Sequence, residues 1–150
     1  MNIAFALACL VCSCSAFANS NWLTMAGDPL DAGASTIEID PTSASPLGDR
    51  PMRVLRISYP QEHTSSDGVA FRSYRAQVEF DCTYRNARFV SVDFYEQSIW
   101  RGQPHKSIAY SPAPVRPVIF RSFEPSLLEK LVQAACHAAT SPKNKKMGTV

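Results

Sequence analysis

Residues 71–83 read FRSYRAQVEFDCT, the clearest two-residue alternation in the chain. One face of this stretch carries the apolar side chains Tyr74, Ala76, Val78, Phe80 and Cys82. The opposite face carries Ser73, Arg75, Gln77, Glu79 and Asp81. A period of two predicts a β-strand with one buried face. Because the other face is so polar, we expect it to be solvated, in an antiparallel sheet covered on one side only.

The flanking segments extend this strand into a sheet. A tight turn at 84–86 leads into a second strand at 88–96, with Val90, Val92 and Phe94 inward, so the two strands form a hairpin. Upstream, we predict strands at 21–26, 36–40 and 52–59, and Ile37 and Ile39 mark the second as half-buried. A loop at 60–68 ends the third, and 106–110 is a further short strand. The expected sheet has five to six strands.

The last predicted element is a helix at about 125–138, which begins at Pro125, a residue favoured in the first helical turn. Its apolar residues recur at helical spacing and form one stripe: Leu128, Leu131, Val132, Ala135 and Cys136. The stripe predicts that the helix packs on the apolar face of the sheet. The fold class is therefore α+β.

The N-terminus predicts export. Residues 3–11 form an uncharged apolar run that is too short to cross a membrane. Ala16 and Ala18 then supply a small-x-small cleavage site, so we predict a signal peptide at 1–18 with cleavage after Ala18. The alternative is a lipoprotein, in which Cys14 becomes the lipidated N-terminus. The mature chain contains no predicted membrane span.

Cleavage also decides the fate of the cysteines. Three of the five, at 9, 12 and 14, leave with the signal peptide, and Cys82 and Cys136 remain. An even number of cysteines in an oxidising compartment predicts a disulfide. Both residues lie on inward faces, one on a strand and one on the helix, so the bond would link the helix to the sheet. The expected domain spans 19–139, followed by a disordered basic tail at 140–150.

Composition and motifs exclude several classes of function. Hydrophobic content is 45%, which argues against a disordered chain, and a net charge of +2 with scattered arginines does not predict nucleic-acid binding. No G-x-S-x-G, H-E-x-x-H or phosphate-binding glycine loop occurs. We interpret His63, His105 and His137 as solvated, and Asp81, Asp93 and Glu96 as surface acids. We therefore predict no catalytic residue, metal site or cofactor.

Basic and aromatic residues gather around the central hairpin. Arg75, Arg85, Arg88 and Tyr84 form a candidate protein-binding patch, because exposed Arg and Tyr are enriched at interfaces. The alternative is that Arg75 pairs across the strands with an acid such as Asp93.

The order of features resembles the surface-adhesin protein E family of bacterial exported proteins. Trp22 follows the cleavage site, and an alternating strand ends in Asp40. An aromatic strand ends in Asp81-Cys82 with Arg85 and Arg88 after it, and a Pro125-Ser126 helix start leads to Cys136. The resemblance implies an antiparallel sheet packed with helices. The family namesake is an adhesin that binds host extracellular-matrix proteins and plasminogen.

The resemblance implies a non-enzymatic exported protein, periplasmic or at the cell surface, that binds extracellular-matrix or envelope proteins. Two alternatives stay open. One is a periplasmic small-ligand carrier or enzyme with a pocket between helix and sheet. The other is an outer-membrane lipoprotein. The sequence does not indicate an oligomeric state.

Overall fold

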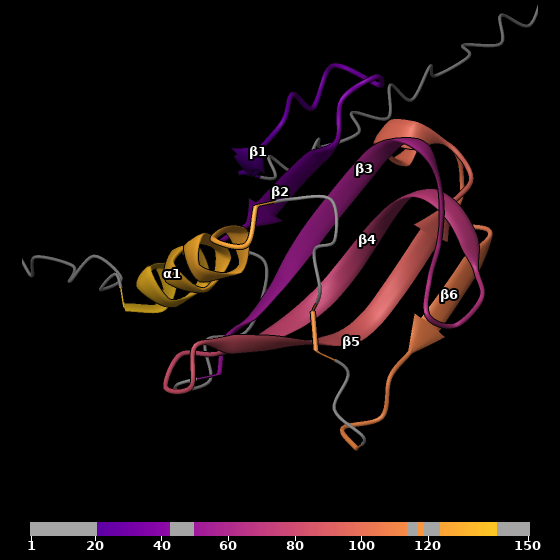
Figure 1. Ribbon diagram of the computed structural model, residues 1–150. Helices are drawn as coiled ribbons and strands as arrows, with labels where there is room; N and C mark the ends of the chain where they lie inside the picture. The colour runs from indigo at the N-terminus through magenta and orange to yellow at the C-terminus, as the bar shows by residue number, and fades with distance from the viewer. Residues whose placement is uncertain (1–20, 43–49, 114–116, 119–123, 141–150) are drawn as a thin grey trace, which may run out of the picture.

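A computed structural model describes residues 21–42, 50–113, 117–118 and 124–140 (Figure 1). Six strands form one antiparallel sheet in which neighbours in sequence are also neighbours in space. They are β1 Leu23–Ala26, β2 Thr36–Asp40, β3 Met52–Thr64, β4 Ala70–Asp81, β5 Asn86–Tyr95 and β6 Lys106–Ala109. A short 3-10 turn, η1 (Ser98–Trp100), separates β5 from β6, and the helix α1 (Leu127–Thr140) comes last. The predicted fold class and number of strands are confirmed.

The core lies between one face of the sheet and α1, which lies across that face near the β4–β5 turn (Figure 1). The alternation of β4 is as predicted, because Tyr74, Ala76, Val78 and Phe80 are all buried. Ile37, Ile39, Leu55 and Ile57 extend the same face across β2 and β3. We call this the core face, and its opposite the polar face.

A disulfide joins Cys82 to Cys136, which lie 54 residues apart in the sequence, and confirms the predicted link. Cys82 lies one residue beyond the end of β4, and Cys136 lies on α1. Both residues are half-buried, so the bond lies at the edge of the core rather than in its centre.

The helix begins at Leu127, later than predicted. Pro125 lies in the preceding turn, where Leu127 N donates to the Glu124 carbonyl. Leu127 is buried together with Leu131, Val132 and Ala135. The predicted apolar stripe is therefore confirmed at Leu131, Val132 and Ala135. The prediction omitted Leu127, which packs inward at the first turn of the helix.

The predicted loop at 60–68 is wrong in its first half, because β3 continues to Thr64. The pairing of β3 with β4 is interrupted between Ser58 and His63. Pro60 falls in this interval, where its missing N–H breaks no ladder hydrogen bond. His63 therefore lies on a strand, where its ring is 4.0 Å from that of Tyr59.

The inward position assigned to Val90 is also wrong. Gln77 pairs with Ser91, whereas Val78 pairs with Phe89, so β5 holds one extra residue at Val90. Such a bulge reverses the alternation. Phe89 consequently faces the core, with its ring 6.1 Å from that of Tyr74.

The polar face is less solvated than predicted. Every residue of β2 is buried, including Glu38 and Asp40, so β2 is not half-buried. Ser73 is fully buried as well. Ser73 is covered by η1, which packs on β3 and β4 and which the next section describes. Thr36 of β2 lies against the β1–β2 connection, where its Oγ1 donates to the Asp28 carbonyl at 2.8 Å.

The predicted signal peptide at 1–18 lies outside the described residues, and so do residues 141–150 of the tail predicted at 140–150. Thr140 is the last residue of α1, and the boundaries 19–139 stay predictions. Among the residues that the structure describes, no helix is long and apolar enough to cross a membrane.

Candidate functional site

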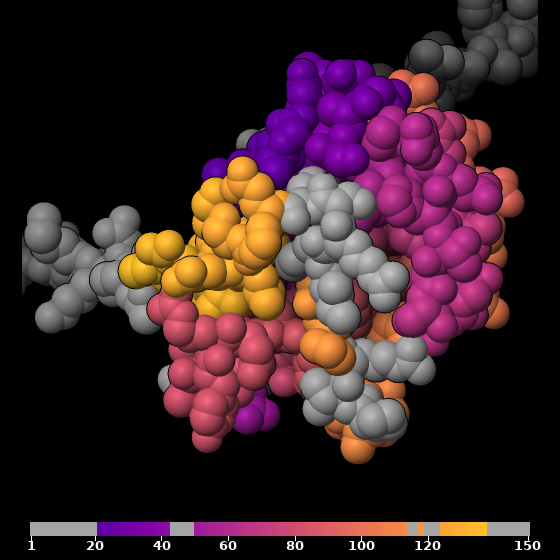
Figure 2. Space-filling model, viewed as in Figure 1, coloured from indigo at the N-terminus to yellow at the C-terminus, as the bar shows by residue number. Residues whose placement is uncertain are grey.

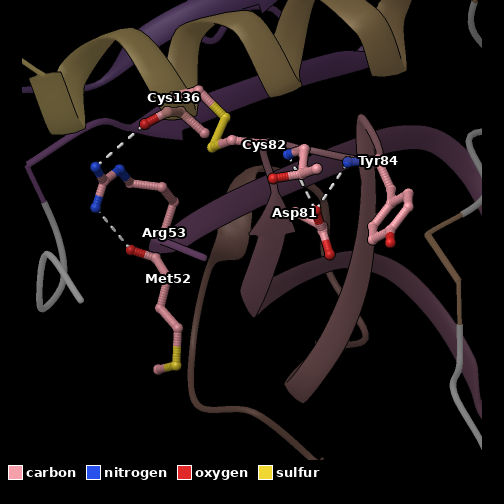
Figure 3. The surroundings of a disulfide bond; sticks show 8 residues. Met52, Arg53, Asp81, Cys82, Tyr84 and Cys136 are labelled. Atoms are coloured by element: carbon pink, nitrogen blue, oxygen red, sulfur yellow. Dashed lines mark hydrogen bonds between the residues drawn. A yellow bond between two sulfur atoms is a disulfide. The ribbon is translucent and has the colours of Figure 1, made fainter. Parts of the chain in front are cut away.

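The tip of the β4–β5 hairpin presents Tyr84 and Arg85. Asp81 Oδ1 accepts hydrogen bonds from Thr83 N at 3.1 Å and Tyr84 N at 2.9 Å, which fixes the turn (Figure 3). Tyr84 is 74% exposed. Arg85 has a φ of 53°, and its Nη2 lies 2.7 Å from Glu129 Oε1 of α1. An ion pair therefore ties the hairpin tip to the helix beside the disulfide.

A cleft of about 270 Å³ lies between this tip and α1, which are side by side in Figure 2. Its lining comprises Cys82, Arg85, Glu129, Val132, Gln133, Cys136 and His137. Pockets for small ligands are usually larger and mainly apolar. This cleft is small and polar, so it suits a small polar molecule at most.

The four residues of the predicted patch do not lie together. Tyr84 and Arg85 occupy the hairpin tip. Arg88 lies on β5, where its Nε and Nη2 donate to the two carboxylate oxygens of Glu79, at 2.9 and 2.8 Å. Arg75 is exposed in the middle of β4. The register places Asp93 directly opposite Arg75, but the two form no ion pair among the described residues.

The polar face holds a stack that the sequence did not reveal. The guanidinium of Arg56 lies between two indoles, 4.1 Å from the ring centroid of Trp22 and 4.3 Å from that of Trp100. Its Nε donates to Glu38 Oε2 at 2.6 Å. The Glu38 side chain is only 3% exposed and that of Arg56 is 26% exposed. Cation–π contacts and a charge-assisted hydrogen bond thus fix this arginine on every side. We call Trp22, Arg56 and Trp100 the tryptophan–arginine stack.

Trp100 is anchored to the two central strands. Its Nε1 donates to the carbonyls of Ile57 at 3.1 Å and Tyr74 at 3.0 Å. Its backbone N donates to Ser73 Oγ at 3.0 Å, and Ser73 Oγ donates in turn to the Gln97 carbonyl at 2.6 Å. These bonds explain why Ser73 is fully buried on a face predicted to be solvated.

The backbone at η1 is strained. Ile99 and Trp100 both have left-handed conformations, with φ of 56° and 53°. A β-branched residue rarely adopts this conformation, which costs about 1–3 kcal/mol per residue. Ser58 Oγ accepts from Ile99 N at 2.9 Å and helps to hold it. Strain of this kind gathers at functional sites, so the stack is a candidate site.

A buried arginine on the core face has a structural task instead. Arg53 is 3% exposed and donates from Nη2 to the Ala135 carbonyl of α1 at 3.2 Å and from Nη1 to the Met52 carbonyl at 2.9 Å (Figure 3). Burial lowers the pKa of Arg53, and the negative charge of Asp40 opposes this shift. Arg53 thus fastens the helix to β3 next to the disulfide.

The strongest pKa shifts among the described residues belong to two tyrosines of the core. Burial raises the pKa of Tyr59 to about 12. Burial, together with Tyr59 and Tyr110, raises the pKa of Tyr74 well above its usual value. Both hydroxyls are therefore neutral, which does not suit a general base. The described residues contain no group of three side chains that could hold a metal ion.

The sequence did not predict the stack, because Trp22 was assigned to a strand and to the family resemblance alone, and residues 97–105 were assigned to no element. A signal was nevertheless present. The chain has only two tryptophans. The alternation of β2 and β3 also places Glu38 and Arg56 on the polar face. The register aligns Glu38 with Arg56, and the hydrogen bonds of η1 bring Trp100 to them from a distant segment, which no single stretch of sequence indicates.

A family model described as surface-adhesin protein E matches residues 22–137. The match begins at Trp22 of the stack and includes both cysteines of the disulfide. No curated protein and no solved structure matches this chain.

Proposed function

We propose, because this chain belongs to the surface-adhesin protein E family, that it is an exported, non-enzymatic protein that acts by binding another protein. We further propose that the polar face around the tryptophan–arginine stack is the contact surface. The family description suggests a surface adhesin. The partners that we expect are extracellular-matrix or envelope proteins.

The observation that supports this surface is the fixed geometry of the stack. Trp and Arg are, together with Tyr, the side chains enriched among residues that dominate binding energy at interfaces. Trp22 and Trp100 are half-buried, so each indole retains an accessible edge or face. Both indoles hold Arg56 at about 4 Å. A surface that is already ordered loses little conformational entropy on binding.

The test is binding of mature 19–150 to purified matrix proteins and to an envelope extract. The Trp22 side chain donates no hydrogen bond within the described part of the chain, and Trp22→Ala removes one side of the stack. We expect it to weaken binding about thirtyfold, the effect of losing roughly 2 kcal/mol at a dominant contact. Trp22→Phe should restore most of the affinity, because an aromatic face remains.

Leu30→Ala is the matched control, since Leu30 is 90% exposed and lies in the β1–β2 connection. It should bind like the wild type. Binding that survives Trp22→Ala but is lost in Tyr84→Ala would move the contact surface to the hairpin tip. That result would refute the assignment to the polar face.

We propose that export uses the signal peptide at 1–18 with cleavage after Ala18, and delivers the chain to the periplasm or the cell surface. Intact-mass measurement of the mature protein tests this. A mass that begins at Asn19 supports it. A diacylated N-terminus at Cys14 would show the lipoprotein alternative instead.

A small-ligand carrier is the second candidate, favoured by the cleft at the hairpin tip. Gln133→Trp would fill this cleft from the exposed side of α1. If the variant loses the binding of a small metabolite while its protein binding is unchanged, the carrier hypothesis gains support.

A further inference from the structure

We propose that the polar face recognises an acidic, extended peptide segment of its partner, and that Arg75 binds the carboxylate. This inference rests on the proposed function and names the chemistry of the partner. It depends on a row of side chains that crosses the whole sheet.

The antiparallel register aligns one residue from each strand on the polar face. Thr24 pairs with Glu38, Glu38 with Arg56, and Arg56 with Arg75. In the same register, Arg75 lies opposite Asp93, and Asp93 lies opposite Ser107. We call these six residues the central row: Thr24, Glu38, Arg56, Arg75, Asp93 and Ser107.

Two arginines lie at the centre of this row, directly opposite each other on β3 and β4. Like charges in this position destabilise a sheet. Arg56 is neutralised by Glu38, 2.6 Å away, and is enclosed by the two indoles. Arg75 has no such partner, because it is exposed and forms no side-chain hydrogen bond or ion pair within the described part of the chain. Arg75 therefore places a second positive charge next to Arg56 and makes no described polar contact that would stabilise the fold in return.

The acid on the other side of Arg75 is directed elsewhere. Asp93 Oδ1 accepts the hydroxyl hydrogen bond of Ser107 at 2.6 Å. The formal charges of the four charged residues in the row sum to zero, so the net charge of the row does not select a ligand. The positions of the charges select it, because the two arginines occupy the centre of the row and the two acids lie on either side. A carboxylate placed over Arg75 meets the one guanidinium of the central row that has no anionic partner within the described part of the chain.

The surroundings of Arg75 fit a peptide. Arginine binds a carboxylate through two parallel hydrogen bonds, which lysine cannot match. Gln77 is exposed on the same face two residues along β4, and its amide can bond to a peptide backbone. Trp100 donates hydrogen bonds to Ser73 Oγ and to the Tyr74 carbonyl, and these two residues directly precede Arg75 on β4. An indole thus borders the carboxylate site.

The experiment measures binding of fluorescein-labelled poly-L-glutamate to mature 19–150 by fluorescence anisotropy. We expect Arg75→Gln to weaken binding about tenfold or more, the usual effect of losing a charge-assisted hydrogen-bond pair. Arg50→Gln is the charge-matched control, since Arg50 is exposed, pairs with Asp81 and lies outside the central row. It should change the affinity less than about twofold, as expected for screened charges at a distance. Arg75→Gln should not lower the melting temperature, because it removes a like-charge pair.

Several results would overturn the inference. Equal weakening by Arg75→Gln and Arg50→Gln would mean that only net charge matters. Heparin binding that depends on Arg75, with no binding of poly-L-glutamate, would point to a sulfated glycan instead. If Trp22→Ala abolishes partner binding but Arg75→Gln leaves it intact, the proposed function stands and the acidic ligand is wrong. If poly-L-glutamate binding depends on Arg75 but Trp22→Ala leaves partner binding intact, the proposed contact surface fails on its own.

Discussion

The disulfide should contribute a large share of the stability of this domain. The double variant Cys82→Ser/Cys136→Ser opens a loop whose ends lie 54 residues apart. The chain-entropy relation for a loop of this length gives about 14 cal/mol/K, or about 4 kcal/mol at 25 °C. Domains of this size have stabilities of about 5–15 kcal/mol, so the variant should fold but be much less stable.

Thermal unfolding followed by circular dichroism measures the effect. A domain of about 120 residues has an unfolding entropy of about 0.25 kcal/mol/K, so a loss of 4 kcal/mol lowers the melting temperature by about 15 °C. Wild-type protein in excess reductant should melt at the temperature of the double variant. The double variant should not respond to reductant.

A shift below about 5 °C would refute this reasoning, because the loop entropy predicts three times as much. Helix docking would then depend on other contacts. The main contacts would be the hydrogen bond from Arg53 to the Ala135 carbonyl and the packing of the buried Leu131 side chain. A melting temperature that falls in reductant but not in the double variant would also contradict it.

Three further predictions concern the core and η1. Leu131→Ala removes a fully buried side chain of α1 and should cost about 2–5 kcal/mol in urea unfolding, while Lys130→Ala on the exposed side should cost less than about 0.5 kcal/mol. Ser73→Ala leaves the backbone N–H of Trp100 without its acceptor, so it should cost about 1–3 kcal/mol and shift tryptophan fluorescence to the red. Because burial raises the folded pKa of Tyr59 from 10.0 to about 12, its stabilisation is fully present below pH 10 and is lost as the pH rises towards 12. Tyr59 should therefore contribute roughly 3 kcal/mol to the fall in unfolding free energy across this window. Tyr74, whose pKa burial also raises, adds to the fall, so Tyr59→Phe should reduce the fall without abolishing it.

The parts of the fold that the sequence predicts are those set by a local, unbroken period. The alternation at 71–83 identified β4 and its buried face, and the spacing of Leu131, Val132 and Ala135 identified the inward side of α1. Those two patterns together located the disulfide. Each depends only on which side chains prefer to leave water, and no knowledge of the partner strand is needed.

The errors occur where one strand gains residues relative to its neighbour. The extra residue at Val90 reverses the face of Phe89, and the interruption between Ser58 and His63 allows β3 to pass through Pro60. A bulge is decided by the pairing across the sheet, so the strand that contains it carries no separate signal. The same limit applied to the site, because Glu38, Arg56 and Trp100 come from three separate segments.

The proposed function gives the two faces of the sheet different roles. The described features that fix α1 lie on the core face or at its margin: the disulfide, the Arg85–Glu129 ion pair, Arg53 and the buried stripe of the helix. The features that cost stability lie on the polar face, where Ile99 and Trp100 are strained and Arg75 opposes Arg56. Proteins keep arrangements that lower stability mainly at functional sites, so the difference between the two faces supports the polar face as the recognition surface. It also implies that Arg75→Gln, at the exposed and unpaired arginine of the central row, should alter affinity without unfolding the domain, whereas variants under the helix should do the reverse.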